Sequence, residues 1–88
     1  MPEYLVEAYL PTADGATRRR VVATARSAAE EMARTGTAIR YLRSIFVPTD
    51  ETCFHLFDAP SAELVREASE RAGLGPERIV EAIQRERG

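Results

Sequence analysis

The spacing of apolar and polar positions divides the chain into strand-like and helix-like segments. Residues 4–10 have strand length and strand-forming side chains, and the turn formers of 11–15 end this run. From about 17 to 35 the apolar positions recur at helical spacing, and Gly36 is placed to end the helix in a left-handed conformation. The apolar positions of this predicted helix are Val22, Ala25, Ala29 and Met32.

The middle of the chain is typical of a hairpin. Two strand-like runs, 39–47 and 52–58, are joined only by residues 48–51. Because this link is so short, the two strands must pair antiparallel.

A second helix and a last strand follow the hairpin. Ser61 is the expected N-terminal cap, Leu64, Ala68 and Ala72 lie along one side, and Gly73 ends the helix. Residues 78–83 read as a strand, and 83–88 as a polar C-terminal tail.

The order strand, helix, strand, strand, helix, strand predicts a single α+β domain over residues 1–88 with a ferredoxin-like fold. Its four-stranded antiparallel sheet would carry both helices on one face. Right-handed crossovers place the first and third strands at the centre, the second beside the third, and the fourth beside the first.

The phase along each strand predicts which residues face the helices, because alternate side chains point to opposite faces. The small or apolar set expected to face the helices is Val6, Ala8, Leu42, Phe46, Phe54, Leu56, Val80 and Ala82. The opposite set, expected on the open face, is Leu5, Glu7, Tyr9, Tyr41, Arg43, Ile45, Cys53, His55, Phe57, Ile79, Glu81 and Ile83. A solvated face rarely holds so many large apolar side chains, so we expect a homodimer joined through the open sheet faces.

Length and charge narrow the range of partners. A chain of 88 residues makes one domain that buries a modest share of its surface, so association with a second copy would help it. The net charge of -2 argues against a general affinity for nucleic acid. No signal segment and no membrane-spanning run is visible, so we expect a cytoplasmic protein with no nucleic-acid or membrane partner.

The candidate chemistry centres on the only cysteine and the only histidine, Cys53 and His55. A spacing of two on a strand places both side chains on one sheet face, where they can serve as ligands of a transition metal. The predicted open face brings further polar groups beside them, namely Glu7, Tyr41, Arg43 and Glu81.

We therefore consider His55, Glu7 and Cys53 as metal ligands, and Arg43, Tyr41 and Glu81 as groups that bind a ligand. Plainer interpretations stay open: His55 as a hydrogen-bonded interface residue, Cys53 as an unreactive side chain, and Arg43 as the partner of an acid. The run Arg18–Arg20 is most simply a solvated helix start, since successive helical residues point in different directions.

Four stretches of the sequence resemble a family of small, mostly uncharacterised bacterial domains known as nickel-binding. They are residues 2–7, residues 40–61, and the stretches 71–74 and 77–81 that follow the hairpin. The resemblance covers nearly the whole chain except the first helix. It implies a ferredoxin-like fold and a homodimer joined through the sheets.

The resemblance also implies a ligand pair, a histidine on the second strand and a cysteine on the third. When Asp58–Pro60 is aligned with the family's acidic-Ala-Pro element, Arg43 falls at the histidine position and His55 at the cysteine position. A guanidinium does not coordinate a metal. This departure leaves two alternatives, metal binding in altered form or binding of an anionic small molecule.

Three classes of function follow from these observations. The first is a protein that binds a divalent transition metal, with nickel as the first candidate. The second is a dimeric small-molecule binding protein or cofactor-free enzyme, in which His55 acts as a base and Arg43 holds an oxyanion. The third is a structural interaction domain. No phosphate-binding glycine loop, nucleophile elbow or CxxC motif supports other chemistry, and whether the protein is an enzyme stays open.

Overall fold

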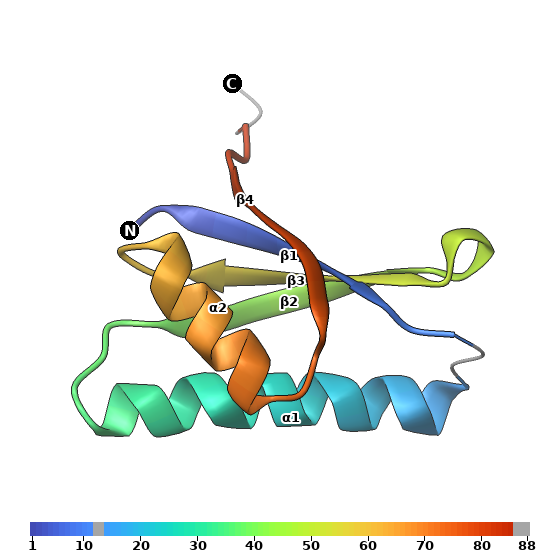
Figure 1. The fold of residues 1–88 in the computed structure, drawn as a ribbon, viewed down its shortest axis with the longest axis horizontal. Coiled ribbons are helices and arrows are strands. Elements are labelled where there is room, and N and C mark those ends of the chain that lie inside the picture. The colour runs from blue at the N-terminus through green and yellow to red at the C-terminus, as the bar shows by residue number, and fades with distance from the viewer. Residues whose placement is uncertain (12–13, 86–88) are drawn as a thin grey trace.

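The structure, a computed structural model, describes residues 1–11 and 14–85. Its elements are β1 (Glu3–Tyr9), α1 (Gly15–Arg34), β2 (Arg40–Val47), the short 3₁₀ helix η1 (Pro48–Asp50), β3 (Thr52–Asp58), α2 (Ala62–Arg71) and β4 (Pro76–Ala82). Figure 1 shows α1 running along one edge of the view, with α2 and the strands beside it. Part of the predicted turn, 12–13, and the end of the predicted tail, 86–88, lie outside the described residues.

Local signals in the sequence fix the helix ends. Ser61 caps α2 by accepting a hydrogen bond from the Leu64 amide, as expected. Asp14 caps α1 in the same way, accepting from the Thr17 amide at 2.7 Å, a cap that the helical spacing alone did not identify. Gly36, just beyond α1, has a φ of 99°, which confirms the predicted left-handed conformation.

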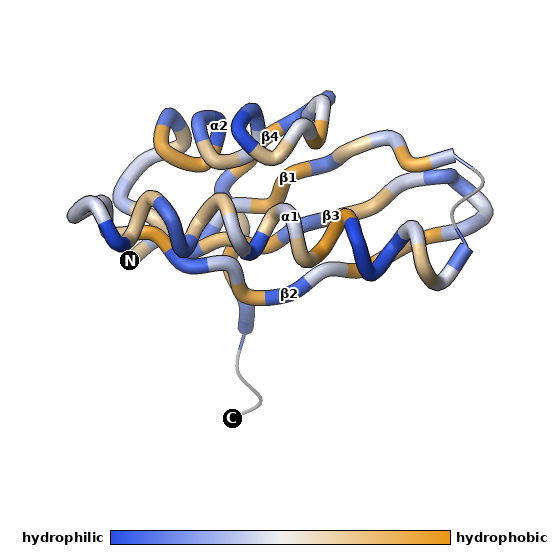
Figure 2. Tube along the Cα trace, turned by 90° about the horizontal axis from the view of Figure 1, so that it is seen from below, coloured by the Kyte–Doolittle hydropathy of each residue, from blue (hydrophilic) through white to orange (hydrophobic). Residues whose placement is uncertain are grey.

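The sheet has the order β2-β3-β1-β4, and every neighbouring pair is antiparallel. This order, together with two helices packed against one face, confirms the predicted ferredoxin-like fold. In Figure 2, α1 lies in front of the sheet, and parts of the strands are visible behind and beside its turns. None of the described helices has the length and apolar character needed to cross a membrane.

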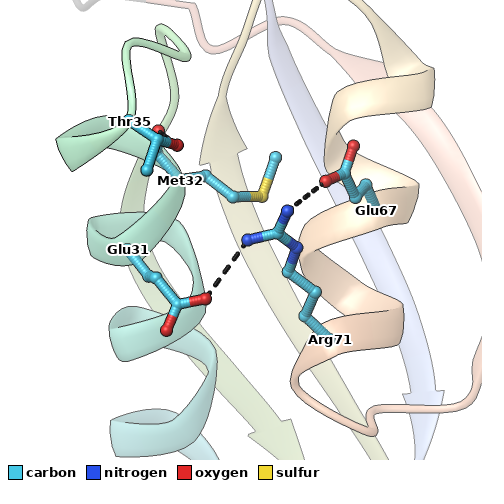
Figure 3. A network of polar contacts seen from close by, with 5 residues as sticks. All are labelled: Glu31, Met32, Thr35, Glu67 and Arg71. Atoms are coloured by element: carbon cyan, nitrogen blue, oxygen red, sulfur yellow. Dashed lines mark hydrogen bonds and ion pairs between the residues drawn. The ribbon is translucent and has the colours of Figure 1, made fainter.

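The two helices are also joined by an arginine. Figure 3 shows Arg71 of α2 between Glu67, one turn earlier, and Glu31 of α1, at 2.6 and 3.2 Å. All three side chains are substantially exposed, so these ion pairs orient the helices more than they stabilise them.

A compact core lies between the helices and the sheet. It contains Val6, Ala25, Ala29, Met32, Ile39, Phe57, Ala59, Val65 and Ala68, all almost completely buried. Tyr4, Tyr41 and Ile79 pack against this cluster. The expected helix positions Ala25, Ala29, Met32 and Ala68 are thus confirmed as core residues.

The predicted phase of β3 is wrong. His55 pairs with Val6 and Cys53 with Ala8, and both β1 partners are buried under the helices. Cys53, His55 and Phe57 therefore face the helices, whereas Phe54 and Leu56 face the open side. The sequence misled because Phe54 and Leu56 are more apolar than Cys53 and His55, so hydropathy favours the wrong side of this central strand.

The predicted assignment of residues to the two faces is also reversed in part of β2 and throughout β4. Tyr41 pairs with Phe57 on the helix side, and an irregularity at Leu42 adds one residue before Arg43 pairs with Leu56. Because of this bulge, Phe46 lies on the helix side, as predicted. Regular alternation along β2 would not place both Tyr41 and Phe46 on that side. In β4 the register places Ile79 and Glu81 on the helix side, while Val80 and Ala82 face the open side.

Candidate functional site

His55 and Cys53 lie on β3 beneath α1, on the buried side of the sheet. His55 is fully buried and Cys53 is 3 % exposed. Their two-residue spacing places them on the same face, as predicted, but this face is covered by the chain's own helices. The pair thus lies in the interior of the domain.

The imidazole of His55 has one partner and one unpaired nitrogen. Its Nδ1 lies 2.7 Å from the hydroxyl of Tyr41, and the two rings lie 5.7 Å apart. Its Nε2 is buried and makes no hydrogen bond with any residue of the described chain. A buried polar atom without a partner is costly, so it is an informative exception in a folded protein.

Burial sets the protonation of all three groups. It lowers the pKa of His55 from 6.5 to about 4, because the charged imidazolium would lose its hydration. It raises the pKa of the Cys53 thiol and, as the largest cause, that of Tyr41 to about 12. At neutral pH the site therefore holds a neutral imidazole, a thiol and a phenol.

A small pocket reaches these side chains from the surface. Its volume is about 180 Å³, and both His55 and Cys53 line it. Arg20 and Thr24 line it from α1, and the turn after α2 closes another side with Leu74. His55, whose Nε2 is unpaired, thus lines a cavity that can hold water, an ion or a very small ligand.

The other predicted site residues are divided between the two faces of the sheet. Glu7 pairs with Phe54 on the open side, where its carboxylate lies 3.7 Å from Arg78. Arg43 is exposed on the same side, opposite Leu56. Glu81 pairs with Tyr4 on the helix side but is exposed on the edge strand β4.

The expected contact of His55 with Glu7 and Arg43 is therefore wrong, because the sheet separates them. The expected proximity of Tyr41 to His55 is confirmed, although on the opposite face from the one predicted. Sequence reasoning missed Arg20 and Thr24. Their spacing of four on α1 places them on one side of the helix, and a correct phase for β3 would have directed attention to that side.

The residues of the site meet only part of the needs of a metal ion. Within residues 1–11 and 14–85, no group of three or more His, Cys, Asp or Glu side chains is placed to hold one. Two donors remain, the unpaired Nε2 of His55 and the sulfur of Cys53. Imidazole nitrogen and thiolate sulfur both suit nickel, so the pair fits part of a coordination shell.

The chain is thus a ferredoxin-like domain with a buried histidine and cysteine beside a small pocket. Residues 4–82 match the family described as nickel responsive protein SCO4226-like, and the chain belongs to that family. The crystal structure of SCO4226 from Streptomyces coelicolor A3(2) has the same fold, with a TM-score of 0.80, 16 % identity, and coverage of 96 % of this chain and 99 % of that one. No protein with a curated description matches the sequence.

Proposed function

We propose that this protein binds a divalent transition metal, with nickel as the first candidate, in the pocket beneath α1. His55 would ligate through Nε2 and Cys53 through its sulfur. The observation that carries the proposal is the buried, unpaired Nε2 of His55, a residue that lines that pocket. The description of the family as nickel responsive supports the choice of metal.

Tyr41 acts as a positioning residue in this proposal. A lone pair is available on Nε2 when Nδ1 carries the proton and donates it to the Tyr41 oxygen at 2.7 Å. Such an outer partner fixes the tautomer and the ring orientation of a ligating histidine. The low pKa of His55 keeps the imidazole neutral, as ligation requires.

The remaining coordination positions go to water or to a small ligand in the pocket. Glu7, which the sequence predicts as a ligand together with His55, lies on the other face of the sheet and takes no part. The Cys53 thiol, whose pKa burial raises, must lose its proton to bind. Nickel binding should then release about one proton per metal ion.

Tyr41→Phe is expected to weaken nickel binding by about 10- to 100-fold, the usual effect of losing an outer-shell partner. His55→Ala removes a ligand outright, so its loss should be larger. Calorimetric titration with nickel in two buffers of different ionisation enthalpy measures the affinity and the proton released.

Tyr4→Phe, the same change at a half-buried tyrosine outside the pocket, is the matched control and should keep wild-type affinity. Glu7→Ala should also bind normally. Unchanged nickel affinity in His55→Ala would rule out this site.

The second function class loses its specific residue pair in this structure. His55 and Arg43 lie on opposite faces, so they cannot act together on one substrate. With a pKa near 4, His55 is also a weak base at neutral pH. The pocket beneath α1 therefore supports metal binding better than acid-base catalysis by this pair.

We also propose that the protein forms a homodimer through its open sheet face. The register moves Tyr41 and Phe57 into the core but places other apolar residues on this face, namely Leu5, Ile45, Val47, Phe54 and Val80. Tyr9 and Ile45 are more than half exposed. Covering this face with the same face of a second copy would remove these apolar side chains from water.

Sedimentation at micromolar concentration is expected to report twice the chain mass. Ile45→Asp should give the single-chain mass, because a charge would then be buried in the interface. Ser27→Asp adds the same charge to the exposed side of α1 and should leave the dimer intact. A dimer disrupted by the Ser27 change and not by the Ile45 change would be joined through the helices, contrary to the proposal.

A further inference from the structure

The N-terminal half of α1 borders a groove. This groove lies on the side of the helix opposite to the pocket lined by His55 and Cys53, the proposed metal pocket. The buried residues of α1 are Ala25, Ala29 and Met32, so no residue of its first ten is buried. A groove of about 420 Å³ lies between this half of the helix and β2. Its lining includes Arg18, Arg19, Val22, Arg26, Phe46 and Cys53.

The lining of this groove is strongly basic. Among the described residues, three arginines and no acidic side chain line it, although the whole chain carries a net charge of -2. The ion pairs between described residues use Arg40, Arg71 and Arg78, and neither Arg19 nor Arg26 takes part in any of them. The hydrophilic stretch of α1 near its N-terminal end is visible in Figure 2.

Aromatic rings hold two of these guanidinium groups in place. The central carbon of the Arg18 guanidinium lies 5.2 Å from the centre of the Phe46 ring, and that of Arg26 lies 5.3 Å from the Tyr41 ring. A guanidinium that stacks on a ring uses its flat face and keeps its N–H donors in the plane. Those donors match the two oxygens of a carboxylate or phosphate.

We propose that this groove binds a small organic anion, in which a carboxylate or phosphate group is attached to an apolar or aromatic body. Arg19 and Arg26 hold the anionic group, and Phe46 and Val22 contact the apolar body. The groove volume falls in the range of about 300 to 1,000 Å³ typical of small-molecule sites. Cys53 lines both cavities, but the residues proposed to hold the anion are not the proposed nickel ligands, so the two proposals can fail separately.

The test uses three probes that share one ring, namely benzoate, phenyl phosphate and the neutral benzyl alcohol. Titration of the full chain, followed by calorimetry or by amide chemical shifts, should show binding of the two anions and none of the alcohol. Affinity should decrease as salt is added, because the contact is between charges. Phenyl phosphate should bind more tightly than inorganic phosphate, since the groove also contacts the ring.

Arg19→Ala and Arg26→Ala should each weaken phenyl phosphate binding by at least about tenfold, the loss of a charged hydrogen-bonding partner. Arg66→Ala, an exposed arginine of α2 outside the groove, is the matched control. Arg19→Ala should retain normal nickel affinity, which separates this site from the metal pocket. Equal binding by the Arg19, Arg26 and Arg66 variants, or equal affinity for phenyl phosphate and inorganic phosphate, would overturn the proposal.

Discussion

Replacing Phe57 with alanine is expected to lower the free energy of unfolding by about 3 to 5 kcal/mol, the usual loss for a buried phenylalanine. Phe57 is completely buried, and its ring meets the Tyr41 ring edge-to-face at a centroid distance of 5.1 Å. The substitution removes this contact and leaves a cavity beneath α1. Urea denaturation followed by circular dichroism measures the change.

Phe54→Ala is the matched control, because it is the same change on the same strand but on the opposite face. Phe54 is only partly buried in the single chain. At protein concentrations low enough to dissociate the proposed dimer, we expect Phe54→Ala to cost clearly less than Phe57→Ala. Equal losses under those conditions would show that the register of β3 is not as described.

The free energy of unfolding is also expected to fall as the pH drops from about 6.5 toward 4, because His55 is buried in its neutral form. Burial lowers its pKa to about 4, whereas the unfolded chain takes up the proton near 6.5. Between these values only the unfolded state binds the proton, so acid favours unfolding. The loss is about 1.4 kcal/mol per pH unit and on the order of 3 kcal/mol in total. Below about pH 4 the folded state is protonated too, and this contribution stops growing.

Chelator-treated protein should be unfolded with urea at several pH values from 7 to 5, a range above most carboxylate titrations. His55→Gln keeps a neutral polar side chain and should lose most of the slope seen in the wild type. The histidine ring signals of the folded protein should not titrate above pH 5. An equal slope in both proteins, or a ring that titrates near pH 6.5, would contradict the buried neutral state.

The sequence predicted the architecture well because local signals determine it. The short link at 48–51 required a hairpin, Ser61 marked a helix start, and the element order defined the strand order. The two-residue spacing of Cys53 and His55 also predicted correctly that they share a face. Each of these inferences depends on neighbours in the chain.

The faces of the sheet were harder to predict because they depend on what covers each one. Phe54 and Leu56 are more apolar than Cys53 and His55, so simple hydropathy placed the wrong pair inside. The bulge at Leu42 has no signature in composition, yet it decides that Tyr41 and Phe46 lie on the same side. The predicted contact of His55 with Glu7 was wrong because hydropathy placed Phe54 and Leu56, and not Cys53 and His55, on the helix side.

Among the described residues, only Cys53 lines both the proposed metal pocket and the groove that contains Arg18, Arg19 and Arg26. The N-terminal half of α1 forms the wall between them, with Thr24 on one side and Val22 on the other. A ligand that shifts Cys53 or converts its thiol to a thiolate in one cavity therefore changes the shape and the electrostatic potential of the other. Such coupling is reciprocal by thermodynamic necessity, so a nickel ion and an organic anion would alter each other's affinity by the same factor.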